Sequence, residues 1–216
     1  MAGRIIGGKL KYRLALPITI VISLLLAVSI VSDYFLQKYQ NEDALREQAY
    51  MLSQQMQAIW DFVSVNQDRI NTDADGSYNF KGLHCSIVGT SVGALFTDRT
   101  DYVFRYVSDA PRNDKNTPDA LETEAIDAFR ADSSLKEYAS FGTLEENGDE
   151  YYRYLVPLKM KSDCVSCHGG PKGEIDVTGF PKEGYSEGDL VGVASISIPT
   201  ELYRNDLAEQ TALQAL

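Results

Sequence analysis

The chain has 216 residues, a length that fits one domain with accessory segments, and contains only three cysteines and two histidines. So few cysteines, in an odd number, exclude a small scaffold held by disulfides, and the lack of a second C-x-x-C pair argues against a four-cysteine zinc ribbon. Residues 1–13 carry four positive charges, whereas the rest of the chain is strongly acidic within a total net charge of −11. This acidity excludes nucleic acid as a partner.

The first predicted element is a membrane helix. Residues 14–32, LALPITIVISLLLAVSIVS, contain no charge, and at about 1.5 Å per residue a helix of this length matches the apolar core of a bilayer. We predict a cytoplasmic tail over residues 1–13 and an anchor over residues 14–36. The positive residues before the anchor place the body on the periplasmic or extracellular side of the cytoplasmic membrane. A cleaved signal peptide is the alternative, since Ala27 and Ser29 are small, but the apolar run continues to Leu36.

A juxtamembrane stalk helix is predicted over residues 37–65, which lack Gly and Pro. Its apolar residues recur at spacings of four and three: Leu45, Ala49, Leu52, Met56, Ile59 and Val63. Such a seam fits a homodimer built through a parallel stalk. It equally fits one helix that packs its apolar stripe on its own domain.

Residues 66–200 are predicted to form an α+β domain. Helices are expected over residues 81–96 and 118–130, and a C-terminal helix over residues 201–216. Strands are expected over residues 102–107, 138–144, 151–158 and 190–198, with Asn147-Gly148 as a two-residue hairpin turn. The order favours an antiparallel sheet flanked by helices, as in PAS or Cache modules.

The helix predicted over residues 81–96 bears two glycines on an apolar face. Gly89 and Gly93 share this face with Cys85, and each glycine lowers helix stability by about 1 kcal/mol relative to alanine. Their presence indicates that something flat or bulky, such as a haem plane, lies close to the face. Tight packing on another element of the protein is the alternative.

The sequence C-V-S-C-H at residues 164–168 carries the main chemical signal. C-x-x-C-H is the attachment signature of haem c: Cys164 and Cys167 would bond the two vinyl groups, and His168 would be an axial iron ligand. We therefore predict one covalently attached haem c. A redox dithiol expects the pair at a helix start in a βαβ unit, whereas here Gly169-Gly170-Pro171 follows. Zinc would need another pair of ligands, and adjacent cysteine and histidine are awkwardly placed to share one ion.

The second axial ligand is less constrained by the pattern. The candidates are Cys85, its neighbour His84, and Met160, with Met51 and Met56 in the stalk as poorer ones. Cys85 lies on the glycine-bearing face, whereas His84 is rotated about 100° from it. A small buried thiol with no ligand role is the ordinary alternative for Cys85.

Three stretches resemble the c-type haem PAS-like family, known as a stand-alone cyanobacterial haem protein and as a periplasmic sensor in bacterial kinases, cyclases and chemoreceptors. They are FKGLHCSIV, the run RNDKNTPD, and YRYLVPLKMKSDCVSCHGGP together with FPKEGYSEGDLVGVASISIP. Asp114 departs from the family, which usually has proline there. The resemblance implies covalent haem at Cys164 and Cys167, with His168 and Cys85 as axial ligands.

Arg112 is predicted as a haem-binding residue, because the haem propionates are anions with which an arginine can form a bidentate ion pair. The alternative is a structural role in the RNxxN turn. Low-potential His/Cys ligation predicts a membrane-anchored redox or gas sensor that acts on a signalling partner. Electron transfer to a redox protein partner is the second function. No enzyme motif is present, so we expect no catalytic residues.

Overall fold

The structure is a computed structural model that describes residues 3–144, 148–201 and 203, with side chains from residue 13 onward. The chain divides into two compact units, residues 1–44 with 201–216, and residues 45–200. The second unit contains the sheet and all residues of the candidate site. The Asn147 half of the predicted hairpin turn and nearly all of the predicted C-terminal helix lie outside the described residues.

Helix α1 runs from Gly3 to Val65. Among the described residues, it is the one helix long and apolar enough to cross a membrane, and its most apolar window is not buried by the rest of the chain. The long apolar helix predicted near the N-terminus is therefore present. Its length and composition are compatible with a single-pass anchor.

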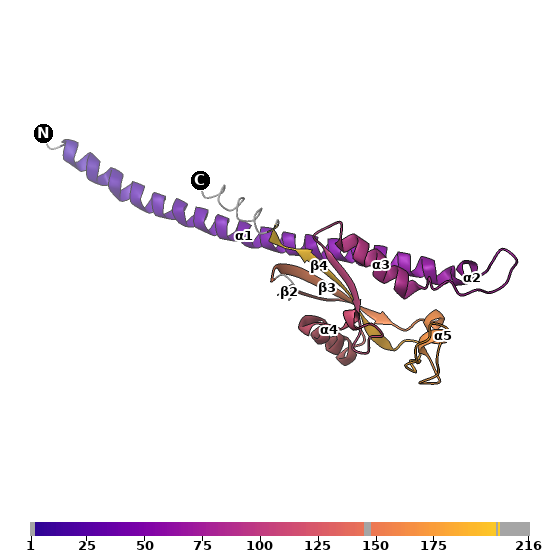
Figure 1. The fold of residues 1–216 in the computed structure, drawn as a ribbon. Coiled ribbons are helices and arrows are strands. Elements are labelled where there is room, and N and C mark those ends of the chain that lie inside the picture. Colours follow the sequence, from indigo (N-terminus) through magenta and orange to yellow (C-terminus); the bar gives the residue numbers. More distant parts are fainter. Residues whose placement is uncertain (1–2, 145–147, 202, 204–216) are drawn as a thin grey trace. The chain divides into compact units, whose positions relative to one another are not determined.

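Four antiparallel strands form one sheet in the order β1-β4-β3-β2 (Figure 1). Their bounds are Val103–Val107 for β1, Tyr138–Thr143 for β2, Glu150–Lys159 for β3 and Leu190–Pro199 for β4. Both central strands, β3 and β4, contain runs of consecutive buried residues, so side chains on both faces of the sheet are covered. The predicted α+β class and the four predicted strands are confirmed.

Helix α4, Ala120–Ala131, covers one face of the sheet. Its buried side chains, Ala125, Ile126 and Phe129, pack with Val107, Leu155 and Val193 of the strands. A capping box starts the helix: Asp119 accepts from the Glu122 amide, and the Glu122 side chain accepts from the Asp119 amide. This core, through Leu155 and Val193, keeps the end of β3 and the start of β4 in place beside the candidate site.

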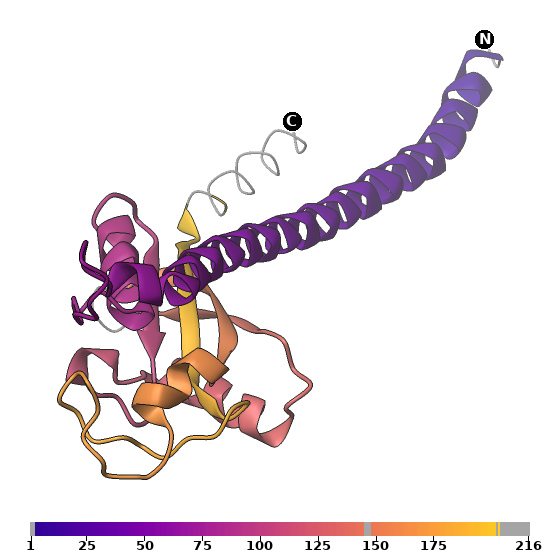
Figure 2. The same ribbon diagram turned by 90° about the vertical axis from the view of Figure 1, so that its right-hand side faces the viewer.

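The other face carries α3, Cys85–Thr97, and the last turns of α1 (Figures 1 and 2). The apolar stripe of the predicted stalk is buried within this chain, with Leu45 2% and Ala49 0% exposed. Packing on its own domain, the second of the two alternatives, is thus the observed use of the stripe. A homodimer through the stalk would need another face of the helix.

Gly89 and Gly93 allow α3 to approach α1 and β1 closely. A Cβ on Gly89 would lie 2.8 Å from the Trp60 ring and 3.0 Å from the Tyr106 ring, and one on Gly93 would lie 2.8 Å from the Phe104 ring. The expectation of a haem plane against these glycines is therefore wrong. Aromatic side chains of the protein itself fill that space.

Several short elements that the sequence did not predict surround the site. They are α2 (Gln67–Ile70), the two 3₁₀ turns η1 (Asp114–Asn116) and η2 (Ser162–Cys164), and α5 (Val165–His168). Each is one turn long, which is too short for a hydrophobic period to reveal.

Candidate functional site

The C-x-x-C-H segment follows the end of β3. The chain turns through η2 into α5, so that Cys164 precedes the helix and His168 is its last residue. Gly169 ends the turn, where its amide donates to the Val165 carbonyl over 2.8 Å. A Cβ at this position would lie 2.5 Å from that same oxygen, so only glycine fits.

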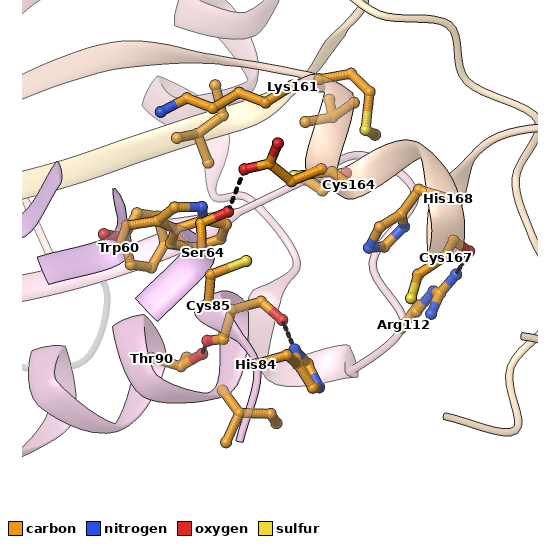
Figure 3. Close-up of a pocket in the computed structure, with 18 of the residues that line it drawn as sticks. Trp60, Ser64, His84, Cys85, Thr90, Arg112, Lys161, Cys164, Cys167 and His168 are labelled. Carbon is orange, nitrogen blue, oxygen red and sulfur yellow. Dashed lines mark hydrogen bonds between the residues drawn. The ribbon is translucent and has the colours of Figure 1, made fainter. Parts of the chain in front are cut away.

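A cavity of about 1200 Å³ lies beside this segment. Its walls come from the end of α1, the start of α3, the loop after β1, the end of β3 and the segment before β4. Figure 3 shows His168 and Cys167 on one wall, and Cys85 and His84 on another. The structure thus brings all five predicted site residues to one cavity: Cys85, Arg112, Cys164, Cys167 and His168.

Cys85 is the first residue of α3, and its thiol interacts with that of Cys164. This hydrogen bond, together with burial, raises the pKa of Cys85. The same bond lowers the pKa of Cys164 to about 7. The largest cause of both shifts is this bond, which stabilises the state in which Cys85 keeps the proton and Cys164 carries the charge.

His168 is held at both its ring and its backbone. Its Nδ1 lies 2.8 Å from Glu183 Oε2. Its carbonyl accepts from the Gly184 amide at 3.0 Å and from the Tyr185 amide at 2.9 Å. Gly184 has φ +86°, a conformation that glycine adopts without strain and that lets both amides converge on one oxygen. The segment 183–185 therefore fixes the orientation of the His168 imidazole.

Arg112 is paired with groups of the protein itself. Its Nε and Nη2 donate to Glu183 at 2.6 and 3.0 Å, and its Nη1 donates to Asp176 at 2.7 Å. Nη2 also donates to the Cys167 carbonyl at 2.9 Å (Figure 3). A structural role, the alternative given for Arg112, has this direct support. The remaining N–H of Arg112, on Nη1, faces Thr178 Oγ1 at 3.4 Å, so a propionate could pair with the arginine only by displacing one of these acceptors.

Two carboxylates complete this cluster. Burial alone would raise the pKa of Asp176, but hydrogen bonds from Thr178 and Arg112 lower it well below its usual range. Burial opposes ionisation of Glu183 as well, and its hydrogen bonds to Arg112 and His168 outweigh that effect and lower its pKa. Both groups are therefore carboxylates at neutral pH.

The other candidate ligands differ in access to the cavity. His84 lines it, its Nδ1 is 2.8 Å from Ser86 Oγ, and its ring stacks on Phe80. Burial is the main cause that lowers the pKa of His84, and the positive charge of Arg112 adds to this effect. Met160 also lines the cavity. The stalk methionines, Met51 and Met56, are not among the lining residues.

Sequence reasoning missed two groups of contacts around the site. Glu183 and Asp176 follow the motif at spacings that no general pattern specifies, although Glu183 lies within FPKEGYSEGD, one of the stretches that carry the family resemblance. On the other side, Ser64 Oγ of α1 donates to Asp163 Oδ2 at 2.6 Å. Lys161 also pairs with Asp61 of α1. These contacts join segments about 100 residues apart, which one sequence cannot reveal.

Comparison with known proteins agrees with this architecture. No curated protein matches the chain. A solved structure described as that of the cyanobacterial haem protein Tll0287 superimposes with a TM-score of 0.56 at 16% identity, over 71% of this chain and 93% of that one. The model of the Tll0287-like family matches residues 38–199, three quarters of the sequence. The chain therefore belongs to the Tll0287-like family.

Proposed function

We propose that this chain binds one haem c and acts as a membrane-anchored sensor of redox state or of a gas on the exported side of the cytoplasmic membrane. The observation that carries the proposal is the placement of C-V-S-C-H on one wall of a large cavity, with Cys85 on another wall. The name of the solved relative, a haem protein, supports the same cofactor.

The residues present fit a haem. The cavity is larger than most small-molecule pockets, which have volumes of about 300–1,000 Å³. Cys164 and Cys167 would hold the macrocycle, and His168 and Cys85 would be the axial ligands. Around the same cavity, Val177 and Phe180 present exposed apolar surface that a macrocycle could cover. A bound haem c would supply one-electron redox chemistry and, when one axial donor leaves, a binding position for a diatomic gas.

Contacts between the motif and α1 favour a sensor. The Ser64–Asp163 hydrogen bond and the Lys161–Asp61 ion pair connect the segment just before Cys164 to the last turns of α1. Because Ser64 and Asp163 are joined at 2.6 Å, a displacement of this segment acts on α1 directly. In this proposal the signal passes along α1 toward a signalling partner at the membrane.

Electron transfer is the second candidate function. His168 is 32% exposed, and the acidic composition of the body suits docking on a basic redox partner. In that case the axial ligands would stay the same in both oxidation states. Neither function assigns a catalytic residue.

Optical and EPR spectra of the purified protein in both oxidation states test the proposal. A pyridine haemochrome band for haem c is expected, and its absence would refute haem binding. Cys85→Ala is expected to change the ferric spectrum, whereas His84→Ala, which alters the adjacent residue at the same cavity, should leave it unchanged. A change of ligation upon reduction supports sensing; identical ligation in both states supports electron transfer.

A further inference from the structure

Glu183 stands between Arg112 and His168. One of its oxygens, Oε1, accepts from Arg112 Nε, and the other, Oε2, accepts from Arg112 Nη2 and lies 2.8 Å from His168 Nδ1. The Glu183 side chain is 18% exposed, so the three groups form a partly buried chain of contacts. Nothing in the C-x-x-C-H pattern calls for a carboxylate at this place.

The donors and acceptors around His168 determine which of its two ring nitrogens carries the proton. An arginine has donors only, and a carboxylate has acceptors only. Since Arg112 already donates to both Glu183 oxygens, the contact with His168 requires that Nδ1 donates. The neutral imidazole then carries its lone pair on Nε2, the nitrogen that is left for a metal.

Charge adds a second effect. Arg112 contributes one positive charge, whereas Asp176 and Glu183 contribute two negative charges, so the cluster behind His168 has a net charge of −1. A carboxylate that accepts from a ligating histidine makes the other ring nitrogen a stronger donor, and negative charge near iron favours the ferric state.

We propose that Glu183, held by Arg112, is a positioning residue that selects the Nδ1–H tautomer of His168 and lowers the reduction potential of the site. The part that concerns the potential rests on the proposed function, since it requires haem. The part that concerns the tautomer is a property of this chain alone.

The potential is tested on the haem-loaded full chain. Glu183→Gln keeps the size of the side chain and removes its charge, and the expected result is a higher midpoint potential, by about 59 mV if the ferric-to-ferrous equilibrium changes tenfold. Glu174→Gln is the matched control: Glu174 pairs with Lys182 in the same loop, and its side chain is 52% exposed. Glu183→Asp retains the charge and should stay nearer to wild type. Equal potentials in Glu183→Gln and Glu174→Gln would overturn the proposal.

The tautomer is tested by ¹⁵N NMR on the haem-free full chain at pH about 9, well above the ordinary histidine pKa of about 6.5. Only two histidines are present, and His84, beside Ser86, serves as an internal reference. The wild type should show His168 protonated on Nδ1. In Glu183→Gln the His168 signals should move and those of His84 should not.

An Nε2-protonated His168 in the wild type, or unchanged His168 signals in Glu183→Gln, would refute the role of Glu183. A wild-type chain that gives no haemochrome band would refute the proposed function instead. The two failures are therefore distinguishable.

Discussion

Replacing Gly89 with alanine tests why α3 lies where it does. The added Cβ would be 2.8 and 3.2 Å from two atoms of the Trp60 ring and 3.0 Å from the Tyr106 ring. Overpacking of this kind costs about 1–3 kcal/mol, and two ring systems meeting one methyl group place it in the upper part of that range. Alanine in a helix recovers about 1 kcal/mol. The net expectation is a loss of about 1–2 kcal/mol in the free energy of unfolding.

Urea denaturation followed by far-UV circular dichroism, with all variants at the same haem content, measures this effect. Ala94→Gly is the matched control, because Ala94 is an exposed residue of the same helix, where glycine should cost about 0.5–1 kcal/mol. The two substitutions are opposite in direction, yet both should destabilise. If Gly89→Ala were more stable than wild type, the close-packing explanation would be refuted.

Two further predictions concern buried charge. Arg153 is 1% exposed and pairs with Asp119 at 2.7 Å and with the fully buried Glu122 at 3.1 Å. Arg153→Met should therefore lower the free energy of unfolding, measured by urea denaturation, by about 3–5 kcal/mol, and adding Glu122→Leu should restore part of this loss. A loss under 1 kcal/mol in Arg153→Met would contradict this expectation. The folded pKa of Asp176 lies below the unfolded value of about 3.9, so its contribution to stability is complete at neutral pH and declines as pH falls below about 5. Acid titration should therefore show a weaker decline in Asp176→Asn than in wild type, and parallel curves would contradict the assignment.

The elements that the sequence predicted are those with a long, regular period. Strand β4, for example, was expected over residues 190–198 with Pro199 closing it, and the strand runs from Leu190 to Pro199. The stripe of α1 was recognised correctly as apolar, but its partner could not be deduced. Leu45 and Ala49 would have the same spacing in a dimer seam and in a domain core.

The glycines of α3, beside the site, are a second case in which the sequence predicts a close contact but not the partner. Their sequence pattern indicates that a bulky group lies close by, and the structure identifies that group as the Trp60, Phe104 and Tyr106 rings. Likewise, the sequence indicates that Arg112 needs an anionic partner, but it does not identify that partner. Here Asp176 and Glu183 meet that need from within the chain.

The two ends of the C-V-S-C-H segment are held by different parts of the protein. Asp163, just before Cys164, bonds to α1 through Ser64. The Cys167 carbonyl and His168, at the other end, are held by Arg112 and by residues 183–185. Since neither set of contacts includes a residue of the other, a movement of α1 can act on the Cys164 end while the imidazole of His168 keeps its hydrogen bonds. Under the proposed function, this separation would let the protein transmit a change at the haem while His168, the proposed ligand, keeps its position.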